Sequence, residues 1–324
     1  MKKIYLFLFL FVSSFAYGQT LLTEDFDYTA GDDLSTKGWA SHSGSSNPIL
    51  VTSPGLTFNG YIGSGIGLAA GVNNTGYDLN KSFGAQTSGT LYTSFLVNAT
   101  ASITAGIYFF HYYDPNAATA HRARTFISTA TEEGKMIVGL SFNSTTPTNM
   151  TTTLNFGQTY LFVVKYEIIE GELNDKVSLY VFAEGESFST EPTTPTLGPL
   201  TTADAKADIV PTGIAIRQDN AAQRITVDGF RVRNSWSDLT TSISDKSKGQ
   251  SELFYPNPVT DGFFNLTTES ISPKNVAIFD LTGKRVFENT TTSTKIDVSM
   301  LKAGIYLVKV TTESETISSK LIIP

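Results

Sequence analysis

Short runs of β-branched and aromatic residues recur along the chain, and each is bounded by glycine, asparagine, aspartate or proline. Such runs are typical of β-strands separated by turns. Between residues 91 and 233 they occupy the ranges 91–97, 106–113, 124–128, 135–142, 159–169, 176–182, 212–217 and 224–233. No window of ten or more residues carries a convincing helical stripe. The sequence therefore predicts an all-β protein.

Charge and cysteine content exclude several classes of function. The chain has 324 residues, with 23 basic and 30 acidic side chains and a formal net charge of -7. This acidic excess argues against a nucleic-acid partner, because phosphate binding needs a surplus of lysine and arginine. The chain has no cysteine, which excludes disulfides, thiolate metal sites and cysteine nucleophiles. Packing, or a bound metal, must then supply the stability of the fold.

The first eighteen residues predict a signal peptide. Two lysines precede an apolar run from Ile4 to Val12, and Ala16 and Gly18 then match the small-x-small pattern of a cleavage site. The apolar run is too short to span a membrane, and we expect no transmembrane helix in the mature chain. We therefore expect export through the periplasm and exclude residues 1–18 from the fold.

A polar segment divides the rest of the chain. The stretch TTSISDKSKGQS, which begins at Thr240, has a single apolar residue and predicts a linker over residues 240–252. The large region, 19–239, suits a jelly roll, because a double sheet of about ten strands hides most of its strand edges. Residues 253–324 carry seven basic and seven acidic side chains, so the acidity belongs to the large region.

Several motifs follow one another in the large region. They are Gly38-Trp39, Ser41-His42-Ser43-Gly44, Asn47-Pro48-Ile49, Tyr92 to Val97, Asn174 to Val181, Val227 to Val232 and Ser235-Trp236. In this order they resemble the concanavalin A-like (laminin G-like) jelly-roll module of secreted bacterial proteins. The resemblance implies carbohydrate binding, adhesion or, as in some enzymes, glycan cleavage. Fold likeness alone does not choose among these.

The spacing of acidic, serine and histidine residues predicts no enzyme. Glycosidases need two carboxylates at a set separation, and the related glucanases place them on one strand as Glu-x-Asp-x-x-Glu, a pattern that this chain lacks. Glu167, Glu170 and Glu172 fall at a strand end and in a turn. Ser64 lies outside any Gly-x-Ser-x-Gly motif. The three histidines show no His-x-x-x-His spacing.

The strand IYFFHYY offers a candidate glycan surface. Ideal alternation places Phe109, His111 and Tyr113 on one face, and we expect that face to point outward because it carries an imidazole and a phenol. Arg122 and Arg124 follow the next loop and would contact sugar hydroxyls or carboxylates. The alternative is that both faces of this strand are buried.

The resemblance also implies a structural calcium site. Related jelly rolls often hold calcium between the first strand and an acidic residue of the last strand. The residues that match by position are Glu24, Asp25 and Asp228. Carboxylate oxygens are the ligands that calcium prefers. The alternative is that Arg231 or backbone N–H groups satisfy Asp228.

The small region carries the most specific motifs. In order they are Phe254-Tyr255-Pro256-Asn257-Pro258, Gly262 to Leu266, Val276 to Asp280, Leu281 to Val286, Ile296 to Val298, Leu301 to Val310 and Lys320 to Pro324. The alternating runs predict a β-sandwich of about six or seven strands, with a hairpin loop at Asp280–Lys284. The motifs are similar to the type A C-terminal sorting domain of the type IX (Por) secretion system. That resemblance implies an immunoglobulin-like sandwich that the outer-membrane translocon reads.

Three functions remain open at this point. We expect a secreted or cell-surface protein that binds a polysaccharide or surface glycan, exported through residues 253–324. A polysaccharide-active enzyme is the second hypothesis, and turnover of a glycan would identify it. A structural surface module is the third, and it would bind no glycan.

Overall fold

The computed structural model describes residues 19–324 except 45, 118, 202–207, 238, 241–253, 268–272, 281 and 312–315. The predicted signal peptide, 1–18, and the predicted linker apart from Thr240 lie outside the described residues. Thr240 itself pairs with Tyr61 in the large unit. The chain divides between residues 242 and 243 into two compact units.

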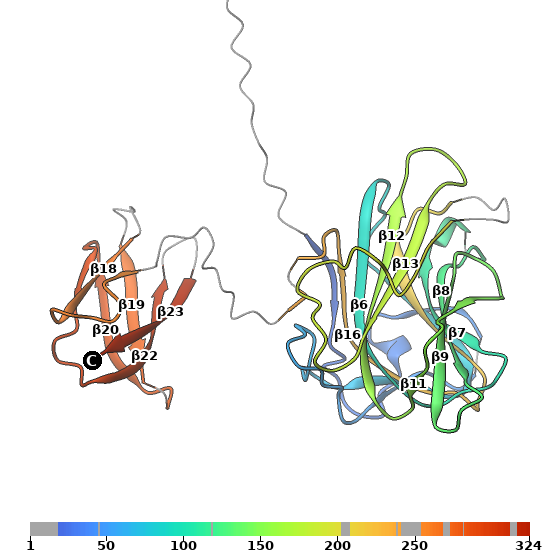
Figure 1. The fold of residues 1–324 in the computed structure, drawn as a ribbon, viewed down its shortest axis with the longest axis horizontal. Helices are drawn as coiled ribbons and strands as arrows, with labels where there is room; N and C mark the ends of the chain where they lie inside the picture. Colours follow the sequence, from blue (N-terminus) through green and yellow to red (C-terminus); the bar gives the residue numbers. More distant parts are fainter. Residues whose placement is uncertain are drawn as a thin grey trace, which may run out of the picture. The chain divides into compact units, whose positions relative to one another are not determined.

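The large unit is built from two antiparallel sheets of eight strands each. The first sheet has the order β14 (Leu197–Thr201), β13 (Lys176–Phe182), β12 (Thr159–Ile168), β6 (Gly89–Ala101), β16 (Arg224–Arg233), β4 (Ala69–Val72) and β3 (Leu50–Thr52), with β1 (Thr20–Glu24) paired to β16. The second sheet has the order β10 (Thr148–Asn149), β9 (Lys135–Ser141), β8 (Arg122–Thr129), β7 (Ile107–Tyr113), β15 (Gly213–Asp219), β5 (Thr75–Ser82) and β2 (Ala40–Ser43), with β11 (Leu154–Asn155) paired to β9. Figure 1 shows β6, β12, β13 and β16 in one layer and β7, β8 and β9 in the other. The only helical elements among the described residues are the 3-10 turns η1 (Leu34–Thr36) and η2 (Pro115–Ala117).

Phenylalanine rings join the two sheets. Phe95 of β6 stacks on Phe110 of β7, with ring centroids 4.9 Å apart, and on Phe230 of β16 at 4.6 Å. Phe162 of β12 lies 5.9 Å from Phe95, and Phe109 of β7 lies 6.4 Å from it. All five side chains are fully buried. The all-β sandwich predicted from the sequence is confirmed.

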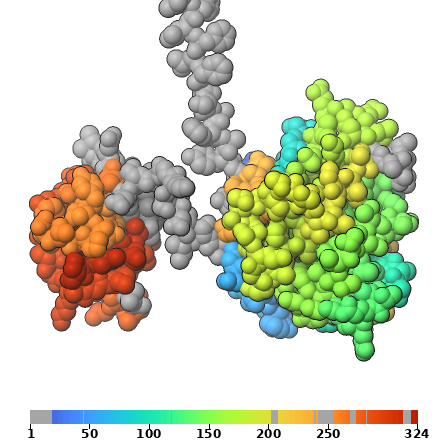
Figure 2. Space-filling view, in the orientation of Figure 1, coloured from blue at the N-terminus to red at the C-terminus, as the bar shows by residue number. Residues whose placement is uncertain are grey.

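Apolar side chains cover much of both faces of the first sheet. A second apolar cluster covers its far side and contains Phe58, Tyr61, Tyr92, Leu96, Leu161, Val163, Tyr180, Phe182, Phe188, Trp236 and Leu239. The Trp236 indole N–H donates to the carbonyl of Phe188 at 2.9 Å, which fastens the C-terminal stretch of the unit to the loop after β13. In Figure 2 yellow atoms from that loop cover the front of the large unit.

The small unit is a sandwich of seven strands in the described residues. A sheet of β17 (Phe254–Tyr255), β18 (Phe263–Leu266) and β21 (Lys295–Asp297) faces a sheet of β20 (Arg285–Thr291), β19 (Lys274–Phe279), β22 (Gly304–Thr311) and β23 (Thr316–Ile323). Its core includes Phe254, Phe264, Ile278 and Val308. The predicted hairpin loop joins β19 to β20, where the Asp280 carboxylate accepts from the N–H groups of Thr282 and Lys284.

We predict that Phe95→Ala destabilises the large unit by about 3–5 kcal/mol, because it removes the ring on which four other phenylalanines pack. Urea unfolding followed by tryptophan fluorescence measures this, since both tryptophans, Trp39 and Trp236, belong to the large unit. Ile66→Ala is the control, because Ile66 is 44% exposed. An equal effect of the two substitutions would contradict the prediction.

Candidate functional site

All three histidines of the chain meet on the outer face of the second sheet. His42 lies in β2, His111 in β7 and His121 directly before β8. Their ligand atoms lie within 4.8 Å of one another, and we call this group the histidine cluster. The ring centroids of His111 and His121 are 4.0 Å apart, and that of His42 lies 5.6 Å and 5.8 Å from them. Within the described part of the chain, no other set of three histidine or acidic side chains gathers in this way.

Strand irregularities bring His42 and His111 together. The register of β2 against β5 shifts between Ser41 and Ser43, so His42 is an extra residue in a bulge and is free of the normal alternation. Two strands, β5 and β15, lie between β2 and β7. The residue of β15 opposite His111 is Ala215, whose methyl group leaves room above the sheet. The bulged His42 ring can therefore lean across to His111.

Each imidazole has a polar contact at Nδ1. His111 Nδ1 lies 2.9 Å from the carbonyl oxygen of Tyr112, so this nitrogen donates and the neutral ring keeps its lone pair on Nε2. His121 Nδ1 lies 3.1 Å from the Tyr108 hydroxyl. His42 Nδ1 lies 3.3 Å from Asn80 Nδ2. The buried Nε2 atoms of His111 and His42 have no hydrogen-bond partner among the described residues.

Burial keeps two of these rings neutral. Burial, together with the charges of His121 and Arg217, lowers the pKa of His42 to about 4. Burial also lowers the pKa of His111, which is completely inaccessible to solvent, and His121 adds to that shift. At neutral pH His42 and His111 therefore offer lone pairs and N–H groups rather than positive charge.

Two arginines supply the positive charge of this face. The guanidinium carbons of Arg217 and Arg124 lie 4.3 Å and 4.8 Å from the centroid of the Tyr108 ring. Arg217 pairs with Asp78 at 3.4 Å and with Asp219 at 2.8 Å. Arg124 is half-buried and forms no ion pair within the described part of the chain. Burial lowers the pKa of Arg124, which shows that its charge is incompletely solvated.

The structure corrects part of the predicted glycan face. The register of β7 against β8 shifts twice, between Tyr108 and Phe110 and between Phe110 and Tyr112. These bulges turn Phe109 into the core together with Phe110, so the expectation that Phe109 lies on the outer face is wrong. His111 and Tyr113 do join this face, where the Tyr113 ring lies 4.9 Å from His42.

Arg122 and Arg124, both predicted to line the glycan surface, point to different environments for a similar reason. Ala123 has a φ of 54°, a left-handed conformation that breaks the alternation between its neighbours. Arg124 reaches the histidine cluster, but Arg122 is 3% exposed and lies over the Phe142 ring at 5.5 Å. Burial lowers the pKa of Arg122. The nearby carboxylates of Asp208 and Asp175 oppose this shift in part. Arg122 therefore lies in a buried charge group with Asp175 and Asp208, and its guanidinium donates to the His121 carbonyl at 3.5 Å.

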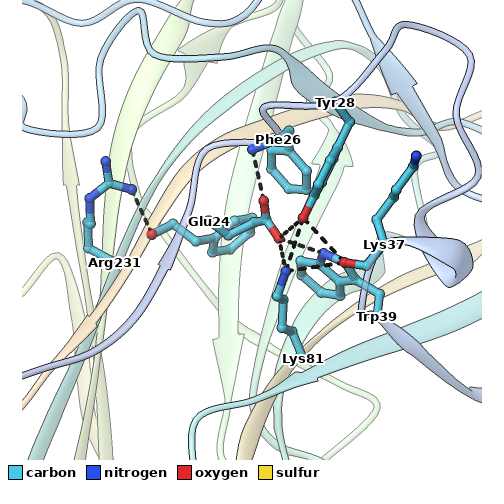
Figure 3. A network of polar contacts seen from close by, with 8 residues as sticks. Glu24, Phe26, Tyr28, Lys37, Trp39, Lys81 and Arg231 are labelled. Atoms are coloured by element: carbon cyan, nitrogen blue, oxygen red, sulfur yellow. Dashed lines mark hydrogen bonds and ion pairs between the residues drawn. The ribbon is translucent and has the colours of Figure 1, made fainter.

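The predicted calcium ligands are occupied by protein donors. Figure 3 shows Glu24 accepting from the Phe26 N–H at 2.9 Å, the Trp39 indole at 3.0 Å and the Tyr28 hydroxyl at 3.1 Å, and pairing with Lys81. Because each carboxylate oxygen already has a donor, Glu24 has little capacity left for a cation.

The other two acidic residues have partners as well. Asp25 pairs with Arg231 at 2.6 Å. Asp228 accepts from the backbone N–H groups of Leu56 at 2.7 Å and Gly229 at 2.6 Å, which is one of the alternatives left open by the sequence. In the described part of the chain these carboxylates do not form a group of three metal-ligating side chains, and the calcium site stays a prediction.

Sequence reasoning missed His42, His121, Tyr108 and Arg217. His42 lies in the motif Ser41-His42-Ser43-Gly44. His111 lies within the aromatic strand, and His121 ends the loop that follows it. Spacing along the chain could not join them, because the contact depends on strand order and on two bulged strands. The signal in the sequence that could have found the cluster is that all three histidines lie in strands or loops of the large region, 19–239.

Comparison with known proteins identifies the small unit. Residues 253–324 match the family model described as "Secretion system C-terminal sorting domain". This confirms the sorting domain predicted from the sequence, and the protein is exported by the type IX secretion system to the cell surface or the surrounding medium. Among the described residues, none lies in a helix with the length and apolarity of a membrane span.

Other similarities are more limited. The chain is 32% identical to the ulvan lyase NLR42 of Nonlabens ulvanivorans over 96 residues, which are 28% of this chain and 18% of the lyase. It therefore spans less than a fifth of that relative. Among solved structures, the T. cruzi calreticulin globular domain aligns with 67% of this chain and 89% of its own, at 10% identity and a TM-score of 0.39. The alginate lyase from Alteromonas sp. 272 aligns with 62% of this chain and 96% of its own, at 11% identity and a TM-score of 0.31.

We predict that Lys81→Met destabilises the large unit by about 3 kcal/mol, because Glu24, whose side chain is 4% exposed, loses its cationic partner. Lys37→Met is the matched control. It breaks the pair with Asp32, whose side chains are 31% and 30% exposed, and should cost less than about 1 kcal/mol. Urea unfolding followed by tryptophan fluorescence compares the two variants, and equal losses would contradict the prediction.

Proposed function

We propose that the large unit binds an acidic polysaccharide on the outer face of its second sheet, and that the sorting domain delivers this unit to the cell surface or medium. The observation that carries the proposal is the Arg124 guanidinium, which lies half-buried on the Tyr108 ring without a carboxylate partner in the described chain. A polyanion supplies the missing negative charge. This proposal narrows the glycan-binding expectation of the sequence to anionic glycans.

The residues around Arg124 suit a sugar chain. Guanidinium groups recognise carboxylate and sulfate oxygens through paired N–H donors. The half-buried ring of Tyr113 offers an apolar surface for a pyranose ring, beside His42. The neutral histidines and Asn80 can exchange hydrogen bonds with sugar hydroxyls. The ulvan lyase is named for a polysaccharide, which is consistent with this class of ligand.

A second candidate function is polysaccharide cleavage by β-elimination. It is favoured by the contact of the Tyr108 hydroxyl with His121 Nδ1 at 3.1 Å, next to an arginine. In such a reaction a base removes the proton next to the uronate carboxylate, the C4–O bond breaks, a C4=C5 double bond forms and the leaving oxygen takes a proton. Arg124 would balance the carboxylate, and Tyr108 and His121 are of the types that transfer protons. Burial raises the pKa of Tyr108, so its phenol stays protonated at neutral pH.

We predict that Arg124→Ala weakens binding of a polyuronate or sulfated polysaccharide about tenfold or more, because it removes a charge-assisted contact. Binding is measured by affinity electrophoresis against the acidic polysaccharide and a neutral one. Arg285→Ala is the matched control, since it changes the net charge equally but lies in the small unit and is exposed. Equal affinities of the two variants would refute the proposed surface, and no binding by the parent protein would favour a structural module.

The same preparations test the second candidate. Formation of an unsaturated product, followed by its ultraviolet absorbance, indicates β-elimination, and Tyr108→Phe should then abolish turnover while leaving binding in place. Binding without any product formation rejects the lyase and keeps the binding function.

We predict that removal of residues 253–324 retains the protein in the periplasm of a bacterium that has the type IX secretion system, because the translocon no longer meets its sorting domain. Immunoblots of periplasm, surface and medium measure the distribution. The full-length chain with Arg285→Ala serves as a control for general effects of substitution. Normal export of the truncated chain would contradict the prediction.

A further inference from the structure

We propose that His42, His111 and His121 bind one divalent transition-metal ion of the zinc class on the outer face of the second sheet. The observation that carries this inference is the convergence of all three imidazoles from three separate segments, with ligand atoms within 4.8 Å of one another. The inference uses the same imidazoles as the proposed sugar-binding surface, but metal binding is measured separately, so its failure and the failure of polysaccharide binding are distinguishable.

His111 is the anchor of the proposed site. Its side chain is 0% exposed, and its Nδ1 donates to the Tyr112 carbonyl. The lone pair of the neutral ring is therefore on Nε2, and no described residue donates to this buried atom. A buried acceptor without a donor destabilises the fold, and a metal ion would satisfy it.

The contacts at Nδ1 of His111 and His121 suit the outer shell of a metal site. Metal-bound histidines almost always use their second nitrogen to contact a carbonyl, a carboxylate or another polar group, which fixes the orientation of the ring. Here Tyr112, Tyr108 and Asn80 contact Nδ1 of His111, His121 and His42. Ligation through Nε2 of His42 places its proton on Nδ1, so the Asn80 amide must then turn its oxygen toward the ring.

The donor set selects the class of metal. Three imidazoles and no thiolate suit zinc, nickel or copper, with a fourth position left for water or another ligand. Calcium is disfavoured because it takes oxygen ligands. The rings of His111 and His121 are inclined by only 19°, so one of them must tilt on binding. His121 is half-buried and ends the loop after β7, which makes it the ring with room to move.

Titration of the chelator-treated mature chain with Zn²⁺ in a calorimeter tests the proposal. We expect one ion per chain, no competition by Ca²⁺, and a zinc-dependent rise in melting temperature. His42→Ala and His121→Ala should each lower the affinity for zinc at least about tenfold. Tyr113→Phe is the matched control, because it lies beside His42 without supplying a nitrogen, and it should bind zinc as the parent does.

Two further measurements keep the result decisive. The primary variants are those of His42 and His121, which are half-buried. His111 is fully buried, so the zinc affinity of His111→Ala is compared only if its tryptophan fluorescence shows the fold of the parent. Titration with Co²⁺ should give the visible spectrum of a tetrahedral nitrogen-ligated ion. Unchanged zinc affinity in both primary variants, or a stoichiometry well below one, would overturn the proposal whether or not the protein binds a polysaccharide.

Discussion

The stacking of Phe95 between Phe110 and Phe230 holds the two sheets of the large unit in register. It requires β7 to present two consecutive aromatic side chains, Phe109 and Phe110, to the same core. A regular strand cannot do this, because neighbouring side chains point to opposite faces. The bulge at Phe109 in β7 allows this, and it leaves His111 on the outer face. The packing of Phe109 and Phe110 in the core and the position of His111 in the candidate site therefore depend on the same strand, β7.

The second constraint is that an apolar cluster covers much of the outer side of the first sheet. Strands β6 and β12 are covered on one side by the aromatic core and on the other by the cluster around Trp236. Parallel sheets usually show this double burial, and here an antiparallel sheet achieves it with loops rather than helices. The second sheet keeps a partly exposed face, on which Arg124, Tyr113 and two of the histidines are half-buried. The ligand-binding surface that we propose is thus set by which sheet the loops leave uncovered.

The sequence predicted the strands well and the candidate site only in part. The runs 159–169, 176–182 and 224–233 became β12, β13 and β16 nearly residue for residue, because hydrophobic and β-branched residues mark a strand locally. Phe109 and Arg122 were misplaced because a bulge and the positive φ of Ala123 change the direction of side chains without a local signature. His42 was missed because its contact with His111 depends on the order of strands in the sheet.

The distribution of charge explains how an acidic unit can present a surface for an anion. The carboxylates near β1 and β16 are neutralised internally, since Glu24 pairs with Lys81 across the two sheets and Asp25 pairs with Arg231. Arg217 is likewise balanced by Asp78 and Asp219. Arg124 has no such partner among the described residues, so its guanidinium can pair with an anion although the chain carries a net charge of -7. The net negative charge of the chain repels a polyanion at long range and slows its approach. The short-range contact with Arg124 then retains the bound polyanion. Salt screens the repulsion between distant charges more than it screens the half-buried contact.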